Sequence, residues 1–259
     1  MIIDEKNLLA LKSIIKTAGQ LVLKIYNQED FKIKIKSDNS PLTEADEASH
    51  KYICTELKKK FPSIPILSEE SSTILDSKTN LFWCIDPIDG TKEFINRNGE
   101  FTINIGLIED KKPIAGLILA PVSNELYYAQ SNYGAFFEKN KKIKRISVKK
   151  FDKRNIVFAI SRSHLNEETK TFLENFANKN FISIGSSLKL CLVANGVVDC
   201  YPRFGPTSFW DIAAGHIIIK ESGGNVINLN HEELQYDLEQ GTLNPNFLAI
   251  NKFPALVND

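Results

Sequence analysis

Hydrophobic residues near the start of the chain recur at steps of three and four positions. The residues on this spacing are Leu8, Leu11, Ile15, Ala18, Val22 and Ile25. This is the period of a helix with one buried face, so we predict an amphipathic helix here. A second helix is predicted over residues 41–61, because a proline and several acidic residues open the segment and lysines close it, in agreement with the helix dipole.

The pattern changes to strand-like runs beyond Ile64. Short β-rich runs separated by Pro, Gly, Asn and Asp continue to about Phe137 and predict a mostly antiparallel sheet. Later strand-like runs alternate with helical stretches near residues 166–178, 187–195 and 209–221, as in α/β proteins. We therefore predict two halves: residues 1–145, with helices and an antiparallel sheet, and residues 146–259, with an α/β arrangement.

One stretch of the chain is strongly basic. Residues 139–150 contain seven lysines and arginines. A solvated connector or hairpin is the ordinary interpretation, because long charged runs usually lie in water. A surface that attracts phosphate or touches a membrane is the alternative.

Composition and charge exclude several classes of protein. Lysine plus arginine and aspartate plus glutamate number 32 each, so no overall field favours a nucleic acid polymer as partner. The four cysteines form no CxxC pair, which argues against a zinc site or a disulfide framework and favours a reducing compartment. No apolar run approaches the roughly 20 residues of a membrane span, and the first residues do not resemble a secretory signal. We expect a cytoplasmic protein, with peripheral contact at the inner face of the cell membrane left open.

The most informative segment is the sequence DPIDGT at residues 86–91. It follows an apolar strand and places Asp86 and Asp89 three positions apart in a turn, where Pro87 restricts the backbone and Gly90 permits a tight bend. Crowded carboxylates repel one another unless they bind a cation, and a set of oxygen ligands alone suits Mg²⁺. An ordinary structural turn is the alternative, because Asp-Pro and Asp-Gly are common turn formers.

Further acidic residues occupy a strand end and a helix start. Glu69 and Glu70 end a predicted strand, and Asp211 opens the apolar helix that begins near Trp210. Each has an ordinary explanation when taken alone, since an aspartate at a helix N-terminus interacts favourably with the dipole. Their combination with Asp86 and Asp89 is what indicates a metal site.

Three segments of the C-terminal half offer groups that bind anions. These are residues 161–164 (SRSH), 185–189 (GSSLK) and 201–205 (YPRFG). A helix start with small serines presents free N–H groups to a phosphate, and a lysine one turn later adds charge. His164 and Tyr201 are candidates to contact a ribose or a base, although such residues are more often structural.

The order of these motifs resembles the inositol monophosphatase-like superfamily of lithium-sensitive phosphatases. The resemblance covers essentially the whole chain and implies an α/β (α+β) fold, a layered α/β/α/β/α sandwich of the sugar-phosphatase type. It implies two or three Mg²⁺ ions, bridged by Asp86, and most ligands in the N-terminal half. The implied metal ligands are Glu69, Asp86, the carbonyl of Ile88, Asp89 and Asp211, with Glu70 as an additional helper. The implied general base is the Thr91 hydroxyl together with Asp46, which belongs to the sequence SPLTEAD at residues 40–46.

The segments SPLTEAD and DPIDGTKEFINRNGEFTINI, with the three C-terminal segments, are similar to the bacterial 3'(2'),5'-bisphosphate nucleotidase branch of this superfamily. That resemblance implies removal of the 3'-phosphate of adenosine 3',5'-bisphosphate to give AMP, which clears a by-product of sulfate activation. The expected substrate contacts are Gly90, Thr91, Ser161, His164, Ser186, Lys189, Tyr201 and Arg203.

Two other functions share part of this pattern. An inositol monophosphatase would have every metal ligand, but Lys92-Glu93-Phe94 follows the nucleotidase pattern where inositol enzymes commonly have Thr-Asn-Phe. A catalytically silent nucleotide or metal binder is disfavoured because the acid set is complete. No apolar stripe is strong enough to decide the oligomeric state, and we expect a monomer.

Overall fold

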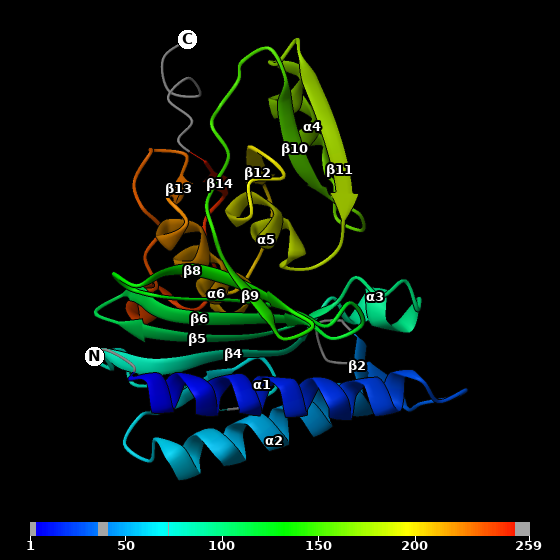
Figure 1. Ribbon diagram of the computed structural model, residues 1–259, viewed down its shortest axis with the longest axis vertical. Coiled ribbons are helices and arrows are strands. Elements are labelled where there is room, and N and C mark those ends of the chain that lie inside the picture. Colours follow the sequence, from blue (N-terminus) through cyan, green and yellow to red (C-terminus); the bar gives the residue numbers. More distant parts are fainter. Residues whose placement is uncertain (1–3, 36–40, 72, 252–259) are drawn as a thin grey trace.

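The structure, a computed structural model, describes residues 4–35, 41–71 and 73–251. Two large β-sheets alternate with three layers of helices, in the order α/β/α/β/α (Figure 1). This arrangement confirms the predicted fold class.

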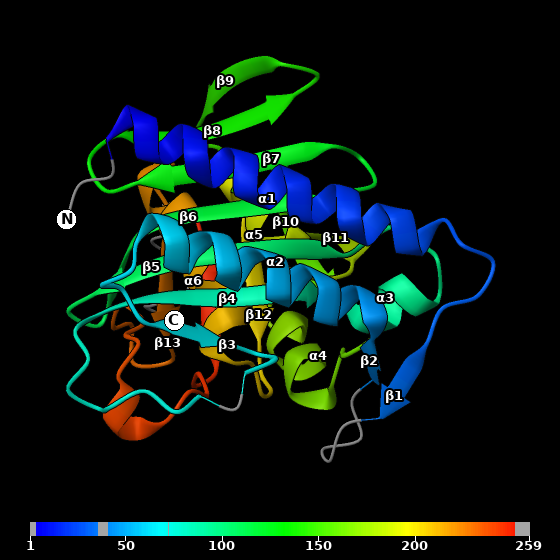
Figure 2. The same cartoon turned by 90° about the horizontal axis from the view of Figure 1, so that it is seen from below.

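Two long helices form the first layer. Helices α1 (Glu5–Tyr26) and α2 (Glu44–Lys60) lie side by side across one face of the larger sheet (Figure 2). The side chains of Leu11, Ile15 and Val22 are buried beneath α1, as the period predicts. The Asp4 carboxylate accepts a hydrogen bond from the Asn7 N–H at 2.6 Å and caps α1. Both predicted helices are confirmed.

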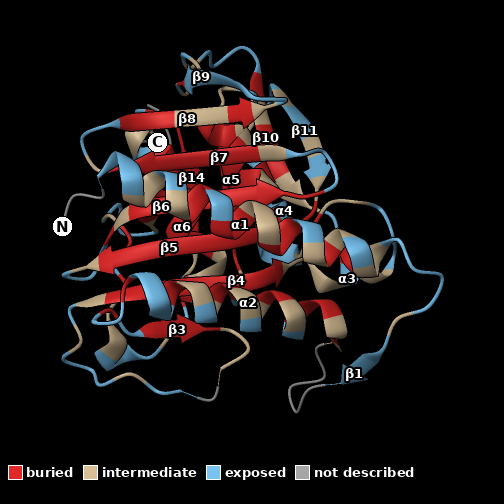
Figure 3. Ribbon diagram, turned by 60° about the horizontal axis from the view of Figure 1, so that its bottom comes forward, coloured by how far each residue is buried: buried red, intermediate tan, exposed pale blue. Residues whose placement is uncertain are grey.

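The second layer is a seven-stranded sheet. Its strands, in spatial order, are β3 (Ile66–Ser68), β4 (Leu81–Asp89), β5 (Thr102–Glu109), β6 (Lys112–Ala120), β7 (Glu125–Gln130), β8 (Gly134–Lys139) and β9 (Lys142–Ile146). Only β3 pairs in parallel, with β4. The mostly antiparallel sheet is therefore confirmed, and its central strands are buried along most of their length because helices cover both faces (Figure 3).

The basic stretch lies mainly in a hairpin at the edge of this sheet. Strands β8 and β9 are joined at Asn140 and Lys141, whose φ angles are 51° and 63°. Residues 142–145 of β9 are exposed. The hairpin interpretation is confirmed, and a phosphate- or membrane-binding role for this stretch stays a prediction.

The upper three layers belong to the rest of the chain. Helices α5 (Leu188–Ala194) and α6 (Phe209–Glu221) lie between the sheets (Figure 1). The smaller sheet has the spatial order β11 (Lys179–Ile184), β10 (Ile156–Ser161), β12 (Cys200–Arg203), β14 (Phe247–Ile250) and β13 (Asn225–Asn228). Helix α4 (Glu167–Glu174) covers its outer face, where Phe172 and Phe176 pack against Phe158.

Several elements differ from the prediction. Helix α4 is shorter than the predicted 166–178. The sequence did not indicate the small hairpin of β1 (Ile33–Ile35) and β2 (Pro41–Thr43), the short helix α3 (Thr91–Ile95) or the 3₁₀ turn η1 (Leu238–Gln240). These pieces are too short for a hydrophobic period to develop.

Glycines in the larger sheet fix the position of α6. A Cβ atom on Gly116 of β6 would lie 2.4 Å from the Ala214 carbonyl oxygen, and one on Gly106 of β5 would lie 3.3 Å from the Ala213 Cβ. The helix backbone thus rests almost directly on the sheet. Because α6 lies between two sheets, its middle residues are buried all round, and its apolar run has no polar face.

The largest hydrophobic cluster joins both predicted halves. It contains Phe82 and Ile118 of the larger sheet together with Ile218 of α6 and Phe247 of the smaller sheet. Whether residues 1–145 and 146–259 behave as separate folding units stays a prediction. Within the described residues, no helix is long and apolar enough to cross a bilayer.

Candidate functional site

Three carboxylates meet where β4 approaches the start of α6. Oxygen atoms of Asp86, Asp89 and Asp211 all lie within 4.8 Å of one another. Asp86 is buried, and the other two are half-buried. The structure thus brings together three of the acids singled out in the sequence, although Asp211 is more than a hundred residues away from the others.

The DPIDGT segment is the irregular end of a strand rather than a free turn. Strand β4 continues to Asp89, but its register with β5 shifts between Asp86 and Asp89. The Ile88 N–H donates to the Asp86 carboxylate at 3.1 Å, and Gly90 follows with a φ angle of 91°. Such an irregularity re-aims side chains next to a site, so that both carboxylates face α6.

Asp211 is held by the cap of its own helix. The Ser208 N–H donates to the Asp211 carboxylate at 2.7 Å in a capping box. Asp211 can therefore cap its helix and also be a metal ligand. One carboxylate oxygen accepts the cap hydrogen bond, and the residue still faces Asp86 and Asp89.

The acids crowd one another strongly. Burial raises the pKa of Asp86 well above its usual range, and the neighbouring carboxylates of Glu69, Asp89 and Asp211 raise it further. Burial and the nearby Asp89 raise the pKa of Asp211 to about 8. Such a cluster of carboxylates is costly to ionise when no cation is bound. A hard divalent cation, which prefers oxygen ligands, stabilises the ionised form. These residues fit a metal site.

Glu69 joins the cluster from the neighbouring strand. Strand β3 pairs in parallel with β4, and the Glu69 N–H donates to the Ile85 carbonyl at 3.2 Å. This places the Glu69 carboxylate next to Asp86. The Ile88 carbonyl oxygen lies 3.4 Å from the Thr91 hydroxyl oxygen. Glu70 follows in the turn but is absent from the described residues that line the pocket, so its helper role stays a prediction.

Asp46 and Thr91 lie side by side, as the sequence motif predicted. The Thr91 hydroxyl is 3.3 Å from the Asp46 carboxylate, to which it donates. The other Asp46 oxygen accepts hydrogen bonds from the Thr43 N–H at 2.8 Å and the Thr43 hydroxyl at 2.5 Å, as part of the cap of α2. The cap therefore fixes Asp46 in the orientation that reaches Thr91.

The cluster opens into a pocket of about 510 Å³ between the two halves of the chain. All the substrate contacts expected from the sequence line it: Gly90, Thr91, Ser161, His164, Ser186, Lys189, Tyr201 and Arg203. The sequence reasoning missed Ser187, Thr207 and Glu93 as pocket residues. Ser187 lies in the segment GSSLK and Glu93 directly follows Lys92, so their proximity to Ser186 and to the DPIDGT segment was the available signal.

The sequence predicted free N–H groups at the start of α5 that would bind a phosphate, and the structure differs. The Ser187 N–H and the Ser186 hydroxyl both donate to the Asp89 carboxylate. Lys189 is buried, donates to the carbonyls of Ser186 at 2.6 Å and Ile184 at 3.3 Å, and has its pKa lowered to about 8 by burial. The expectation of free N–H groups is wrong because the half-buried Asp89 takes these donors.

Positively charged groups also line the pocket. The Lys92 amine lies 3.3 Å from the His164 ring nitrogen, and Arg203 donates to the His164 carbonyl at 3.3 Å. Burial, followed by the charges of Lys92 and Arg203, lowers the pKa of His164. The Lys189 amine also lies 5.2 Å from the centre of the Tyr201 ring. One pocket therefore combines the carboxylate cluster with several cationic side chains.

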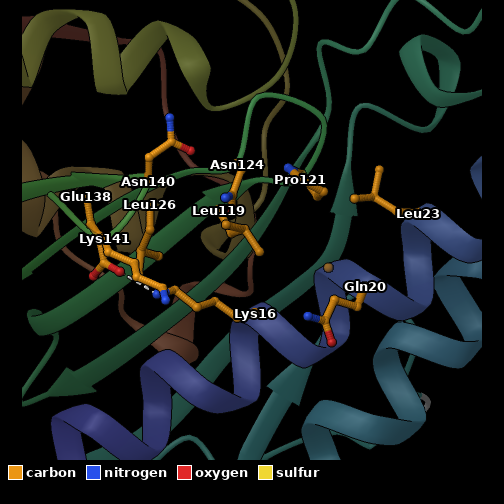
Figure 4. A pocket seen from close by; sticks show the side chains of 11 residues that line it. Lys16, Gln20, Leu23, Leu119, Pro121, Asn124, Leu126, Glu138, Asn140 and Lys141 are labelled. Atoms are coloured by element: carbon orange, nitrogen blue, oxygen red, sulfur yellow. Dashed lines mark hydrogen bonds and ion pairs between the residues drawn. The ribbon is translucent and has the colours of Figure 1, made fainter.

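A second hollow of similar volume lies between α1 and the outer strands of the larger sheet (Figure 4). Glu138 is the one carboxylate among the residues that line it, and it pairs with Lys12 at 2.6 Å and Lys16 at 2.5 Å. Because its acid is already neutralised, this hollow lacks the chemistry of the first pocket.

The sequence model of the inositol monophosphatase family matches residues 4–252. The chain belongs to this family. The 3'(2'),5'-bisphosphate nucleotidase CysQ of Escherichia coli K12 is 42% identical over 235 residues, which are 90% of this chain and 94% of that protein. CysQ of Buchnera aphidicola is also 42% identical, over 226 residues, or 86% of this chain and 84% of that protein.

Solved structures of the family share the fold. CysQ from Bacteroides thetaiotaomicron superposes with a TM-score of 0.84 and 37% identity, covering 96% of this chain and 98% of that one. An IMPase from Thermotoga maritima gives a TM-score of 0.81 at 28% identity, covering 95% and 92% of the two chains. The family and the resemblance to its nucleotidase branch, both expected from the motifs, are confirmed.

Asp211→Asn should remove most of the stabilisation of the fold by Mg²⁺. In the wild type, saturating Mg²⁺ should raise the free energy of unfolding by about 2.7 kcal/mol at a hundredfold excess over Kd, because only the folded state assembles the cluster. The variant keeps an acceptor for the Ser208 N–H and relieves repulsion, so it should be at least as stable without metal and gain little from Mg²⁺. Urea unfolding with and without Mg²⁺ measures both quantities.

Asp199→Asn is the matched control. Asp199 is also buried, but it pairs with Lys149 at 2.6 Å away from the cluster. This variant should lose stability and keep the full increment from Mg²⁺. If Asp211→Asn also keeps that increment, Asp211 does not hold the metal.

Proposed function

We propose that this chain is a Mg²⁺-dependent phosphomonoesterase that removes the 3'-phosphate of adenosine 3',5'-bisphosphate to give AMP and phosphate. The observation that carries the proposal is one pocket that holds both the carboxylate cluster and several cationic side chains. A substrate with two phosphates would place one phosphate at the carboxylate cluster, where a metal would bind, and the other at the cationic groups. The 42% identity to nucleotidases over most of the chain supports the same substrate.

In this proposal Glu69, Asp86, the Ile88 carbonyl, Asp89 and Asp211 hold two or three Mg²⁺ ions. Bound Mg²⁺ would supply charge that polarises the phosphate ester and would make a bound water more acidic. The family and the crowded carboxylates support a metal at this place. Magnesium is preferred because every proposed ligand is an oxygen.

Asp46 and Thr91 form the proposed proton acceptor. The Thr91 hydroxyl already donates to Asp46, so its lone pairs are available to a water beside the metal turn. A proton taken from that water at the Thr91 oxygen would be balanced by transfer of the hydroxyl proton to the Asp46 carboxylate. The capping box of α2 keeps Asp46 fixed during this exchange.

The remaining pocket residues orient the substrate. We assign Gly90 and Thr91 to the scissile phosphate, because they belong to the metal turn. Lys189 and Arg203 are assigned to the second phosphate because of their charge. Ser186, whose hydroxyl donates to the Asp89 carboxylate, is assigned to the part of the pocket beside the cluster. Ser161, His164 and Tyr201 are assigned to the ribose and base, where their hydrogen-bonding groups and ring face suit a nucleoside. All of them line the pocket.

A reducing compartment suits this protein. Its four cysteines are free thiols, and three of them, Cys84, Cys191 and Cys200, are buried, which raises the pKa of each thiol well above its usual range. Such thiols are chemically inert. A cytoplasmic location is therefore part of the proposal. A monomeric state is proposed separately and does not rest on the thiols.

The second candidate function is inositol monophosphatase. The shared metal ligands and the 28% identity to a Thermotoga maritima IMPase favour it. Inositol 1-phosphate has one phosphate, however, and would bring no second phosphate to the cationic groups of Lys92, Lys189 and Arg203. This difference ranks the nucleotide first.

Phosphate release from adenosine 3',5'-bisphosphate and from inositol 1-phosphate, measured side by side, tests the proposal. We expect kcat/KM for the nucleotide to be higher by about 100-fold, because the second phosphate adds charged hydrogen bonds. Omitting Mg²⁺ should abolish both activities. Preference for inositol 1-phosphate would overturn the substrate, and release from neither would favour a silent binding protein.

Asp46→Asn should remove turnover without removing the fold. Loss of the proton acceptor should lower kcat by about 100-fold or more, while the stabilisation by Mg²⁺ stays near that of the wild type. Glu47→Gln, a change of the exposed neighbouring acid on the same helix, is the control and should keep full activity. A near-normal rate in Asp46→Asn would exclude Asp46 from the mechanism.

A further inference from the structure

A short segment connects the metal turn with the substrate end of the pocket. Residues 92–100, called the strap below, comprise most of α3 and the turn that follows it. The strap starts directly after Thr91. It carries two acidic residues, Glu93 and Glu100, that are outside the carboxylate cluster and have no part in the mechanism above.

Glu93 is only 4% exposed and has a specific partner in the other half of the chain. Its carboxylate accepts a hydrogen bond from the Ser163 hydroxyl at 2.6 Å. Two glycines make room for it: a Cβ on Gly185 would lie 2.7 Å from the Glu93 Cγ, and a Cβ on Gly90 would lie 3.3 Å from its Oε2. The backbone on both sides is therefore shaped around this carboxylate.

Glu100 holds the same region from the other end of the strap. It accepts two hydrogen bonds from the Arg162 guanidinium, each at 2.6 Å, and one from the Gly185 N–H at 2.8 Å. Bidentate Arg–carboxylate pairs fix both distance and orientation. Arg162 also donates to the Ser183 carbonyl at 2.9 Å, which ties the segment to β11.

The held segments are those that supply the proposed substrate contacts. Ser163 lies next to His164, whose N–H donates to the Ser161 hydroxyl at 3.1 Å, and Gly185 directly precedes Ser186. The strap thus lies between the DPIDGT segment, where we place the scissile phosphate, and the groups assigned to the rest of the substrate. Its two carboxylates fix the distance between these two parts.

Glu93 could act through its charge alone or by holding its neighbours in place, and these two roles predict opposite effects of its removal. Burial lowers the pKa values of both His164 and Lys189, and the negative charge of Glu93 partly opposes this lowering. If charge alone mattered, neutralising Glu93 would leave the pocket more positive and would favour anionic substrates. The hydrogen bond to Ser163 and the two fitted glycines indicate a geometric role instead.

We propose that Glu93, acting through Ser163, is a positioning residue that fixes the His164 segment and gives the pocket its preference for substrates that extend beyond the scissile phosphate. The inference rests on the proposed function, because it concerns the same pocket and the nucleoside part of the same substrate. Glu100 supports the same segment through its paired hydrogen bonds with Arg162.

Three variants test this role through KM and kcat. Ser163→Ala and Glu93→Ala should each raise KM for adenosine 3',5'-bisphosphate about tenfold, the cost of a lost hydrogen bond to a charged group. Their kcat, and their kinetics with the small monoester β-glycerophosphate, should stay within about twofold of wild type. Glu93→Gln retains a carbonyl acceptor for Ser163 and should restore a KM near wild type.

A double variant and a matched serine complete the design. Ser163→Ala combined with Glu93→Ala should be no worse than Glu93→Ala alone, because both changes remove the same hydrogen bond. Ser183→Ala removes an exposed hydroxyl from the adjacent strand and should leave KM unchanged. Additive losses, an equal effect on β-glycerophosphate, or a lower KM in Glu93→Ala would overturn the proposal.

Hydrogen exchange without substrate separates this inference from the proposed function. Amides of residues 161–166 should exchange at least about tenfold faster in Ser163→Ala than in the wild type, while the rest of the chain is unaffected. If the wild type fails to hydrolyse the nucleotide, the proposed function falls, and faster exchange still supports the positioning of this segment. Unchanged exchange in Ser163→Ala overturns the positioning role whatever the substrate.

Discussion

The mutual repulsion of Asp86, Asp89 and Asp211 is the constraint around which this structure is organised. Three carboxylates within 4.8 Å of one another are unfavourable unless other groups hold them in place. The irregular end of β4 directs two of them, and the capping box of α6 fixes the third. Glycines at 106 and 116 let α6 approach the sheet closely enough for the acids to meet.

The same constraint determines how the two halves of the chain meet. Asp89 takes its hydrogen bonds from Ser186 and Ser187, which belong to the C-terminal half. Thr102 and Asn104 of β5 contact the same serines, with distances of 2.6 to 2.8 Å. The hydrogen bonds to Asp89 therefore bring the segments that we propose to bind substrate to the carboxylate cluster. In our proposal, the strap sets the distance between these segments and the DPIDGT segment.

Much of this organisation could be predicted from the sequence. The period of residues 8–25 predicted α1, and the apolar run that opens at Asp211 predicted α6, because such patterns are local. The motif order gave the family, and through it the Asp46–Thr91 pair that the structure brings within 3.3 Å. The roles of these residues in metal binding and catalysis remain predictions.

Other features could not be predicted, because they depend on partners far along the chain. The Ser187 N–H appeared free for a phosphate, but its acceptor Asp89 lies 98 positions earlier. Glu93 appeared to be part of a family motif, but its partner Ser163 lies 70 positions later. Local patterns do not reveal which buried acid will take which donor, since that choice is made by tertiary packing.

The most direct test of this account is an anomalous difference map from crystals grown with Mn²⁺, which accepts the same oxygen ligands as Mg²⁺. The account predicts strong peaks bounded by Asp86, Asp89 and Asp211, with Glu69 and the Ile88 carbonyl completing the coordination. Crystals that contain Mn²⁺ at other places, with no peak among these three carboxylates, would contradict it.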